Sequence, residues 1–179
     1  MECAVYSSCP LHRHTFFETN KIILVYESWF LKSNIKKYSQ EFYMGIEIKD
    51  TKKVNREKVI ELYKANKWSS AKKPDLLYRA LMNSDTLITA WDGNKLVGLG
   101  NAITDGYLVV YYPHLLVLPE YQGKGIGRMI VESFQKKYGN FHQQMLTADG
   151  GAINFYRKCG FEKAGATQSM WIYQGNEHD

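Results

Sequence analysis

A glycine-rich stretch at residues 123–127, Gly-Lys-Gly-Ile-Gly, has the residue types and spacing to bind a phosphate group. It follows a long apolar run at 107–118 and opens a segment whose apolar residues recur with helical spacing. Glycines let backbone N–H groups approach a ligand, and the unpaired N–H groups of a helix's first turn attract negative charge. Lys124 and Arg128 add positive charge. The stretch predicts a cradle for a pyrophosphate, with a ligand-free glycine turn as the alternative.

The spacing of the glycines excludes two familiar phosphate-binding loops. A nucleotide P-loop needs Gly-x-x-x-x-Gly-Lys-Ser/Thr, which the sequence does not contain. The dinucleotide fingerprint of the Rossmann fold needs its third glycine three positions after the second. Here Gly127 follows Gly125 by two positions, and Arg128 occupies the required place. A different phosphate-containing ligand is therefore expected.

The elements that must position this loop follow from apolar periodicity and turn signals along the chain. Asn55 is suited to cap a helix, Asp92-Gly93-Asn94 to turn a hairpin, and Gly139 and Gly160 to end two helices. The pattern predicts strands at 45–49, 86–91, 95–104, 107–118, 143–148 and 161–173, and helices at 55–67, from 74, at 126–138 and at 152–159. The order β-α-α-β-β-β-α-β-α-β predicts an α/β fold, a single domain with a mixed β-sheet flanked by helices.

Two motifs resemble signatures of one enzyme superfamily. Gln122-x-x-Gly125-x-Gly127 after an apolar strand resembles the acetyl-CoA pyrophosphate motif of the GNAT N-acetyltransferases, Arg/Gln-x-x-Gly-x-Gly/Ala. Residues 152–161, Ala-Ile-Asn-Phe-Tyr-Arg-Lys-Cys-Gly-Phe, resemble the superfamily's second signature, Ala-x-x-Phe-Tyr-x-x-x-Gly-Phe. The resemblance covers Met44 to about residue 173. Stretches near 67–70 and 96–99 are similar to bacterial members that resemble serotonin (arylalkylamine) N-acetyltransferases.

The resemblance implies that acetyl-CoA is the acetyl donor and that no metal takes part. Backbone N–H groups of the cradle would hold the pyrophosphate, and Val117 would pair with the pantetheine arm like an added strand. The N–H of Val117 or of Leu118 would polarise the thioester carbonyl, and Asn154 would bind the pantetheine chain. The expected cofactor-binding residues are Val117, Leu118, Gln122, Gly123, Lys124, Gly125, Ile126, Gly127, Arg128 and Asn154.

The proton transfers of such a reaction need an acid and a route for the amine's proton. The resemblance implies Tyr156 as the acid that protonates the leaving thiolate, since a phenol with a pKa of about 10 is protonated at pH 7. The alternative for Tyr156 is a core aromatic of its helix. His114 is the candidate base because imidazole titrates near neutral pH, and a packed, hydrogen-bonded histidine is the alternative. Glu120, Asp105 and a chain of ordered water are further candidates.

The acceptor would be bound by the predicted helical pair at 55–67 and from 74, which usually lines the acceptor groove in this superfamily. Trp68 and Tyr78 would suit an aryl or alkyl amine there, although core packing explains both equally well. We expect direct acetyl transfer to the primary amine of a small molecule. The alternatives are a protein lysine or N-terminus as acceptor, and a non-catalytic acyl-CoA-binding module.

The composition is that of one globular domain, with 179 residues of which 45% are hydrophobic. The formal charge of +5 favours an anionic partner, but no helix clusters Lys and Arg and no RNA-binding motif occurs, so nucleic acid is not expected. No apolar run approaches the roughly 20 residues that cross a bilayer, so no membrane partner is expected. Three cysteines favour a reducing cytoplasm over a disulfide framework. A homodimer is compatible with such a domain.

Residues 1–43 differ from the remainder because they show no sustained period and no glycine-based turns. Gln40 and Glu41 can be encoded with a purine-rich AGGAG two codons before the codon of Met44, as in a bacterial ribosome-binding site. We therefore predict an irregular N-terminal extension at 1–43, which would be translated upstream sequence, and an acetyltransferase domain at 44–179. Cys3, Cys9, His12 and His14 match no zinc-binding spacing.

Overall fold

The structure is a computed structural model that describes residues 45–172. The predicted extension at 1–43, with its cysteines and histidines, lies outside the described residues. The elements are, in order, β1 (Ile46–Asp50), α2 (Arg56–Ala65), η1 (Ser69–Lys72), α3 (Pro74–Asn83), β2 (Thr86–Asp92), β3 (Lys95–Thr104), β4 (Val109–Val117), η2 (Pro119–Tyr121), α4 (Ile126–Tyr138), β5 (Gln143–Met145), η3 (Gly150–Ala152) and α5 (Ile153–Lys158).

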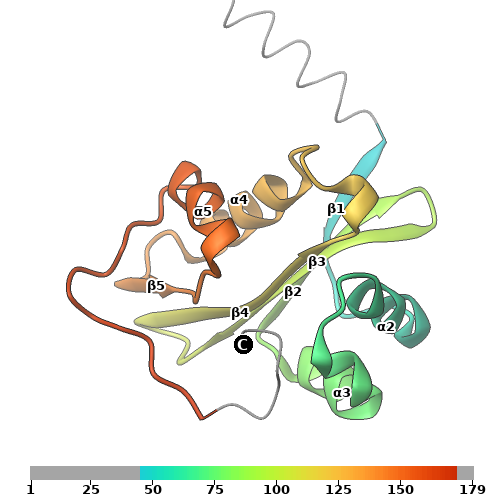
Figure 1. Cartoon of the computed structure of the whole chain (residues 1–179), viewed down its shortest axis with the longest axis horizontal. Helices are drawn as coiled ribbons and strands as arrows, with labels where there is room; N and C mark the ends of the chain where they lie inside the picture. The colour runs from blue at the N-terminus through green and yellow to red at the C-terminus, as the bar shows by residue number, and fades with distance from the viewer. Residues whose placement is uncertain (1–44, 173–179) are drawn as a thin grey trace, which may run out of the picture. The chain divides into compact units, whose positions relative to one another are not determined.

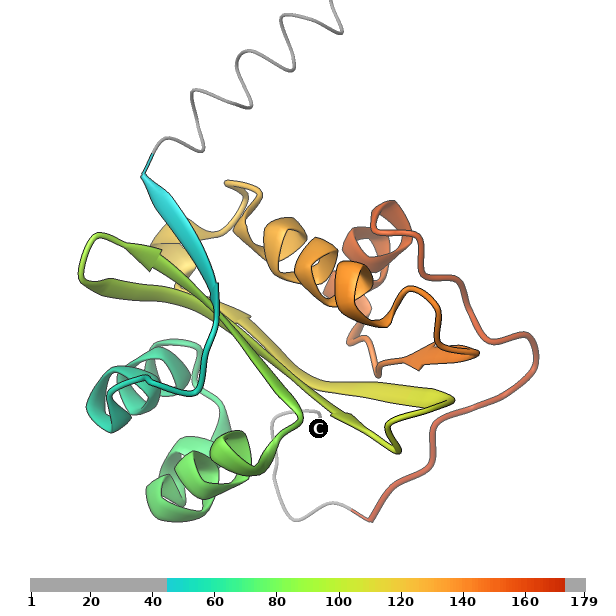
Figure 2. The same cartoon turned by 180° about the vertical axis from the view of Figure 1, so that it is seen from behind.

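The strands form a five-stranded sheet in the order β1-β2-β3-β4-β5. The first four strands are antiparallel to their neighbours, and β5 is parallel to β4. Helices α4 and α5 lie on one face of the sheet, and α2 and α3 lie on the other (Figures 1 and 2). The predicted mixed sheet flanked by helices is confirmed.

Apolar side chains of α2 and α3 pack against one face of this sheet. Val59, Leu62 and Tyr63 of α2 and Leu77 and Leu81 of α3 are buried there. The spacing of these residues is that of one helical face, so burial follows directly from the period of the helix. Full burial of one such side chain contributes about 1.5–3 kcal/mol relative to exposure.

The other face of the sheet is shaped by glycines that let α4 approach closely. A Cβ atom on Gly100 would lie 2.9 Å from Ile130 Cγ2 and 2.9 Å from a ring carbon of Phe134. Gly98 stands under Ile126 and Ile130 in the same way, at 3.2 Å. The backbone of β3 therefore contacts α4 directly, which holds the first turn of α4 close to the sheet.

The first two helices begin where the sequence predicts. The side chain of Asn55 accepts a hydrogen bond from the backbone N–H of Lys58 at 3.1 Å, which caps α2. Pro74 occupies the first turn of α3. The hydroxyl of Tyr78 donates to the carbonyl of Val54 at 2.9 Å, so α3 is tied to the segment that precedes α2.

A β-bulge interrupts β4 at Pro113. Asn101 pairs with His114 and Ile103 pairs with Tyr111, so two steps along β3 match three steps along β4. The extra residue in β4 is a bulge, and proline is tolerated at bulges because it has no N–H to donate to the ladder. The apolar pattern predicts one unbroken strand over 107–118, whereas β4 is shorter and contains this bulge.

The bulge directs neighbouring side chains of β4 to opposite faces of the sheet. Tyr112 stacks on Phe134 of α4, with ring centroids 4.7 Å apart. His114 instead contacts Tyr63 of α2. Residues two apart in a regular strand share a face, so His114 reaches the α2 side only because of the bulge.

Beyond the bulge, β4 and β5 separate. β5 pairs with β4 at Val109, Val110 and Tyr111. Among residues 45–172, no strand continues along that edge as far as Val117. β4 is therefore a central strand in its first half and has an open edge in its second half.

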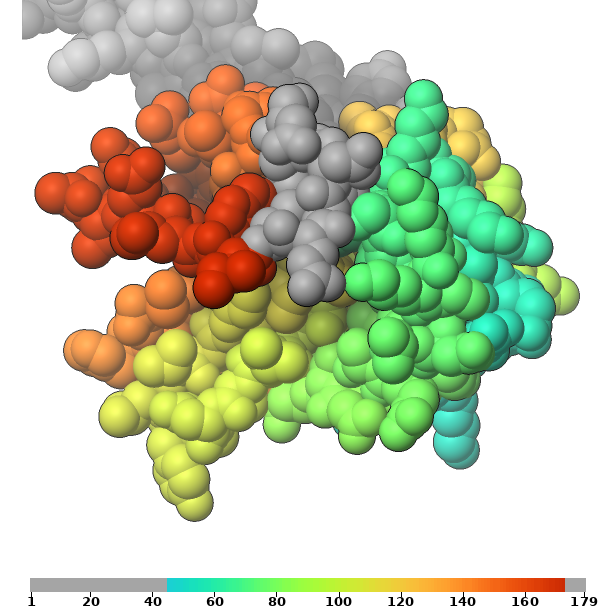
Figure 3. All heavy atoms as spheres, turned by 60° about the horizontal axis from the view of Figure 1, so that its bottom comes forward, coloured from blue at the N-terminus to red at the C-terminus, as the bar shows by residue number. Residues whose placement is uncertain are grey.

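The predicted final strand at 161–173 is wrong over its described part. Residues 161–172 contain no strand, and the predicted strand at 143–148 is limited to Gln143–Met145. Gly165 has a left-handed φ of 57°, and the N–H of Thr167 donates to the carbonyl of Ala164 at 3.0 Å, so the chain turns there. Met170 and Ile172 are almost fully exposed, and Figure 3 shows this end of the described chain at the surface.

Candidate active site

The predicted cradle lies between η2 and α4. Gly123 and Gly125 both have left-handed φ values, 73° and 82°, which glycine adopts without strain. Gly125 is the N-cap of α4, a helix of 13 residues, and no side chain caps it. The first intrahelical bond runs from the N–H of Met129 to the carbonyl of Gly125 at 3.1 Å. The three N–H groups before Met129 are therefore available to an anion.

Two lysines and two carboxylates surround Tyr121, in the segment just before the cradle. The ammonium groups of Lys124 and Lys95 lie 4.9 Å and 5.0 Å from the centre of the Tyr121 ring. The Tyr121 hydroxyl donates to Asp92 at 2.8 Å, and Lys95 pairs with Glu120 at 2.9 Å. Lys124 is not part of that ion pair, although its charge contributes to lowering the pKa of Glu120.

Gly127 brings the two sequence motifs into contact. A Cβ atom on Gly127 would lie 3.2 Å from Cζ of Phe155, so the missing side chain lets α5 pack against the first turn of α4. The same approach places the first turn of α5, with the exposed side chain of Asn154, beside the cradle. The motifs at 122–127 and 152–161 are therefore in contact through Gly127 and Phe155.

The open edge of β4 presents backbone groups next to this site. The N–H of Leu118 donates to the carbonyl of Val97 at 2.8 Å, within the sheet. In an antiparallel ladder successive residues point in opposite directions, so the N–H and carbonyl of Val117 face the open edge. The side chain of Gln122 donates to that carbonyl at 3.1 Å and to Asn66 at 3.4 Å. Of the two predicted thioester donors, Val117 has the N–H that faces the edge.

Tyr156 lies on α5 among other aromatic rings. It makes edge-to-face contacts with Phe155, at 5.0 Å between ring centroids, and with Phe161, at 5.9 Å. Burial raises the pKa of Tyr156 to about 12. The phenol is therefore protonated throughout the physiological range and can donate a proton.

His114 lies in an aromatic cluster on the α2 side of β4. Its Nδ1 atom is 2.6 Å from the hydroxyl oxygen of Tyr63. Trp68 stands edge-to-face to the His114 ring at 5.2 Å and to Tyr63 at 5.8 Å. Burial lowers the pKa of His114 to about 4, so the imidazole is neutral at pH 7. The structure brings the predicted residues His114 and Trp68 together.

Tyr63 is the member of this cluster that sequence reasoning missed. Its helical spacing with Val59 and Leu62 indicates burial, which the structure confirms. A fully buried tyrosine needs a hydrogen-bond partner for its hydroxyl. That requirement was the available signal, but nothing in the sequence pairs Tyr63 with His114, 51 positions away.

The remaining candidate residues, Tyr78, Asp105 and Glu120, are engaged in other hydrogen bonds or ion pairs. The Tyr78 hydroxyl is bonded to the carbonyl of Val54, and its ring packs against the hydrophobic core. Backbone N–H donation from residues 107–109 lowers the pKa of Asp105, in the β3–β4 turn. Glu120 hydrogen-bonds to its own N–H and pairs with Lys95, which also lowers its pKa. Both carboxylates are therefore weaker bases than ordinary ones.

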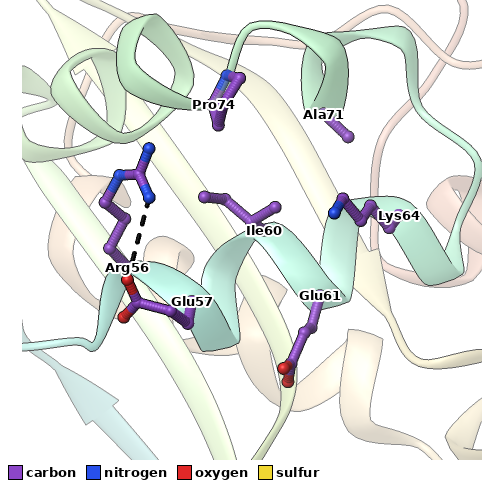
Figure 4. Close-up of a pocket in the computed structure, with 7 residues that line it drawn as sticks. All are labelled: Arg56, Glu57, Ile60, Glu61, Lys64, Ala71 and Pro74. Atoms are coloured by element: carbon purple, nitrogen blue, oxygen red, sulfur yellow. Dashed lines mark ion pairs between the residues drawn. The ribbon is translucent and has the colours of Figure 1, made fainter.

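A separate surface pocket of about 340 Å³ lies between α2 and the segment before α3 (Figure 4). Ile60, Ala71 and Pro74 form its apolar part, and its charged residues are Arg56, Glu57, Glu61 and Lys64. Two positive and two negative side chains balance, so the pocket has no bias toward a phosphate. It shares no residue with the cradle or with the cluster around His114.

Within residues 45–172 no group of three or more His, Cys, Asp or Glu could hold a metal, and no helix is long and apolar enough to span a bilayer.

Comparison with known proteins gives a consistent match. A family model described as an acetyltransferase (GNAT) domain matches residues 83–163. A solved GNAT-family acetyltransferase from Streptococcus pneumoniae TIGR4 is 32% identical, with 73% of this chain and 99% of that chain covered and a TM-score of 0.64. An uncharacterized N-acetyltransferase of Porphyra purpurea is 26% identical over 158 residues, which are 83% of this chain and 90% of the relative.

Other matches are partial or concern the fold alone. Curated acetyltransferases of Arabidopsis thaliana and Glycine max are 34–37% identical over 73 residues, and the chain spans only 27–30% of their length. An aminoglycoside N-acetyltransferase solved in complex with CoA is 14% identical, with 73% of this chain and 94% of that chain covered and a TM-score of 0.56. At that identity the likeness is one of fold.

Proposed function

Because this chain belongs to the GNAT superfamily of acetyltransferases, we propose that it moves the acetyl group of acetyl-CoA directly to the primary amine of a small molecule. The observation that carries the proposal is the uncapped start of α4, which is linked to the open edge of β4 through Gln122 and Val117. Helix α5, which carries the protonated phenol of Tyr156, packs on the first turn of α4 through Phe155 and Gly127.

The residues fit acetyl-CoA, which would supply an activated thioester. Gly123 and Gly125 place no side chain at the turn before α4, and Lys124 would add charge beside it. The N–H of Val117 would donate to the pantetheine arm or to the thioester oxygen, as in strand addition. Gln122 would keep the cradle attached to β4 through the Val117 carbonyl. Tyr156 would protonate the departing thiolate.

The acceptor side favours a small, uncharged amine. The groups found around His114 are the rings of Tyr63 and Trp68, and no charged group contributes to lowering its pKa. A site without a carboxylate does not stabilise an ammonium ion, and an amine must be neutral to attack. Aryl and alkyl amines are therefore better candidates than polyamines.

The direct test is an amine screen with the full chain and acetyl-CoA, following release of free thiol. Arylalkylamines, polyamines, aminoglycosides and a lysine-containing peptide would serve as acceptors. Tyr156→Phe should lower kcat by about 100-fold or more, because it removes the acid, while acetyl-CoA affinity by calorimetry stays within about twofold.

The matched control is Tyr111→Phe, which removes another phenol, one that is bonded to Thr147 at 3.2 Å. It should leave kcat nearly unchanged. An unchanged rate in Tyr156→Phe would remove the proposed acid. Turnover with the peptide alone would favour the protein-acetylating alternative, and tight acetyl-CoA binding without any turnover would favour the binding module.

A further inference from the structure

We propose that Tyr63 holds His114 as a neutral imidazole with its proton on Nε2, so that His114 donates a hydrogen bond on the acceptor side and does not take the amine's proton. Tyr63 is then a positioning residue. The functional part of this inference rests on the proposed acetyl transfer, whereas the protonation state can be tested in the free protein.

The hydrogen-bond requirements of Tyr63 decide the tautomer. Its side chain is 0% exposed, and the partner of its hydroxyl among the described residues is Nδ1 of His114, at 2.6 Å. If Nδ1 carried the proton, the phenol would accept and its own O–H would be buried without an acceptor. An unmade buried hydrogen bond disfavours that arrangement by about five- to hundredfold. The O–H of Tyr63 therefore donates to the lone pair of Nδ1.

The position of the second imidazole proton follows from this bond. A neutral imidazole has one N–H and one lone pair. Because Nδ1 uses its lone pair to accept from Tyr63, the N–H is on Nε2. In that state Nε2 has no lone pair for a proton from the amine, so His114 is a donor to an oxygen and not a general base.

The surroundings of His114 oppose its conversion to the cation. Tyr63 of α2 and Trp68 before η1 pack edge-to-face on the ring, and Asn101 of β3 stands opposite it in the ladder. None of these side chains is charged, and burial favours the neutral imidazole. The Asn101 amide donates to Ser84 at 2.8 Å, so that N–H group is already bonded. A cationic His114 would gain no counter-ion from these neighbours.

The consequence concerns how the amine loses its proton. The acceptor must arrive uncharged, and its proton must leave through water, while the Nε2–H of His114 orients an oxygen of the acceptor or of that water. The pH dependence of kcat/KM on the acid side then follows the pKa of the amine chosen, and it shifts when an amine of different basicity is used.

Nitrogen-15 NMR of the free full-length protein tests the tautomer. Long-range proton–nitrogen spectra distinguish an N–H on Nε2 from one on Nδ1, and His114→Gln identifies the signal by its loss. We expect the Nε2–H pattern, unchanged from pH 6 to 9. Tyr63→Phe should shift the Nδ1 resonance, whereas Tyr138→Phe, which removes another buried phenol bonded to Asp85 and Thr86, should not.

Kinetics test the role. A glutamine amide can donate near the position of Nε2 but cannot act as a base, so His114→Gln should keep kcat/KM within about threefold of the wild type, while His114→Ala loses about tenfold. An Nδ1–H pattern in the NMR spectra would overturn the tautomer. Equal losses in His114→Gln and His114→Ala would overturn the donor role. If no amine is acetylated, the proposed function fails while the NMR result still decides the state of His114.

Discussion

At the scale of single residues, the burial of a neutral His114 links the site to the stability of the protein. The unfolded chain binds a proton at this position near pH 6.5, whereas burial lowers the pKa to about 4 in the folded state. Between these two pKa values the unfolded state binds more protons, so the free energy of unfolding falls as the pH is lowered through this window and is regained above it.

We expect this linkage to lower the free energy of unfolding by about 2 kcal/mol between pH 7 and pH 5. Urea unfolding followed by circular dichroism at several pH values measures it. His114→Gln should flatten the dependence by that amount, whereas substitution of the exposed His142 by glutamine should not. An identical slope in His114→Gln would mean that His114 is not buried in its neutral form.

The site residues show why some roles were predictable from the sequence and others were not. Tyr156 and the cradle glycines belong to contiguous motifs, so their chemistry was predicted from neighbours in the chain. Tyr63 and His114 meet across 51 positions through a helix and a bulged strand. Their contact depends on packing, which no local pattern encodes.

At the scale of elements, the cradle depends on the backbone conformation at the start of α4. Gly125 and Gly106 have nearly the same left-handed φ, 82° and 84°, so a side chain is strained at either position. Only Gly125 precedes the uncapped N–H groups of α4. Gly125→Glu should therefore bring a carboxylate into the cradle and weaken acetyl-CoA binding by about 100-fold or more, through repulsion of the pyrophosphate.

Gly106→Glu is the matched control, because it introduces the same charge and similar strain in the β3–β4 turn. Calorimetric titration with acetyl-CoA should find its affinity close to that of the wild type. Retained binding in Gly125→Glu would place the pyrophosphate elsewhere, and an equal loss in both variants would indicate a general effect of strain.

The elements themselves were largely predictable because caps and periodicity are local. Asn55 and Pro74 begin helices as expected, and Gly125 lies at the predicted start of α4. The prediction of a final strand at 161–173 was wrong because a strand needs a partner edge as well as suitable residues. Residues 161–172 have no partner edge in the described sheet. The bulge was signalled only by Pro113 within an apolar run.

At the scale of the whole molecule, the candidate site residues all lie within residues 45–172. β1 covers the edge of β2 from the pair Ile46 and Asp92 onward. A protein that begins at Met44 should therefore match the full chain in melting temperature and in acetyl-CoA affinity. Thermal unfolding and calorimetry of the two forms make the comparison.

Removal of β1 as well, in a protein that begins at Thr51, provides the contrast. It exposes the edge of β2 and should lower the melting temperature markedly, because the five cross-strand pairs that begin with Ile46 are lost. A lower acetyl-CoA affinity in the Met44 form would show that residues 1–43 contribute to the domain.

The open half of β4 also bears on how the chain avoids unwanted pairing with other extended chains. A sheet edge with unpaired N–H and carbonyl groups can add any extended peptide, including one from another copy of the same protein. Here Pro113 has no N–H to offer, the bulge breaks the register, and Gln122 already occupies the Val117 carbonyl. These irregularities shorten the run of free backbone groups that another extended chain could pair with.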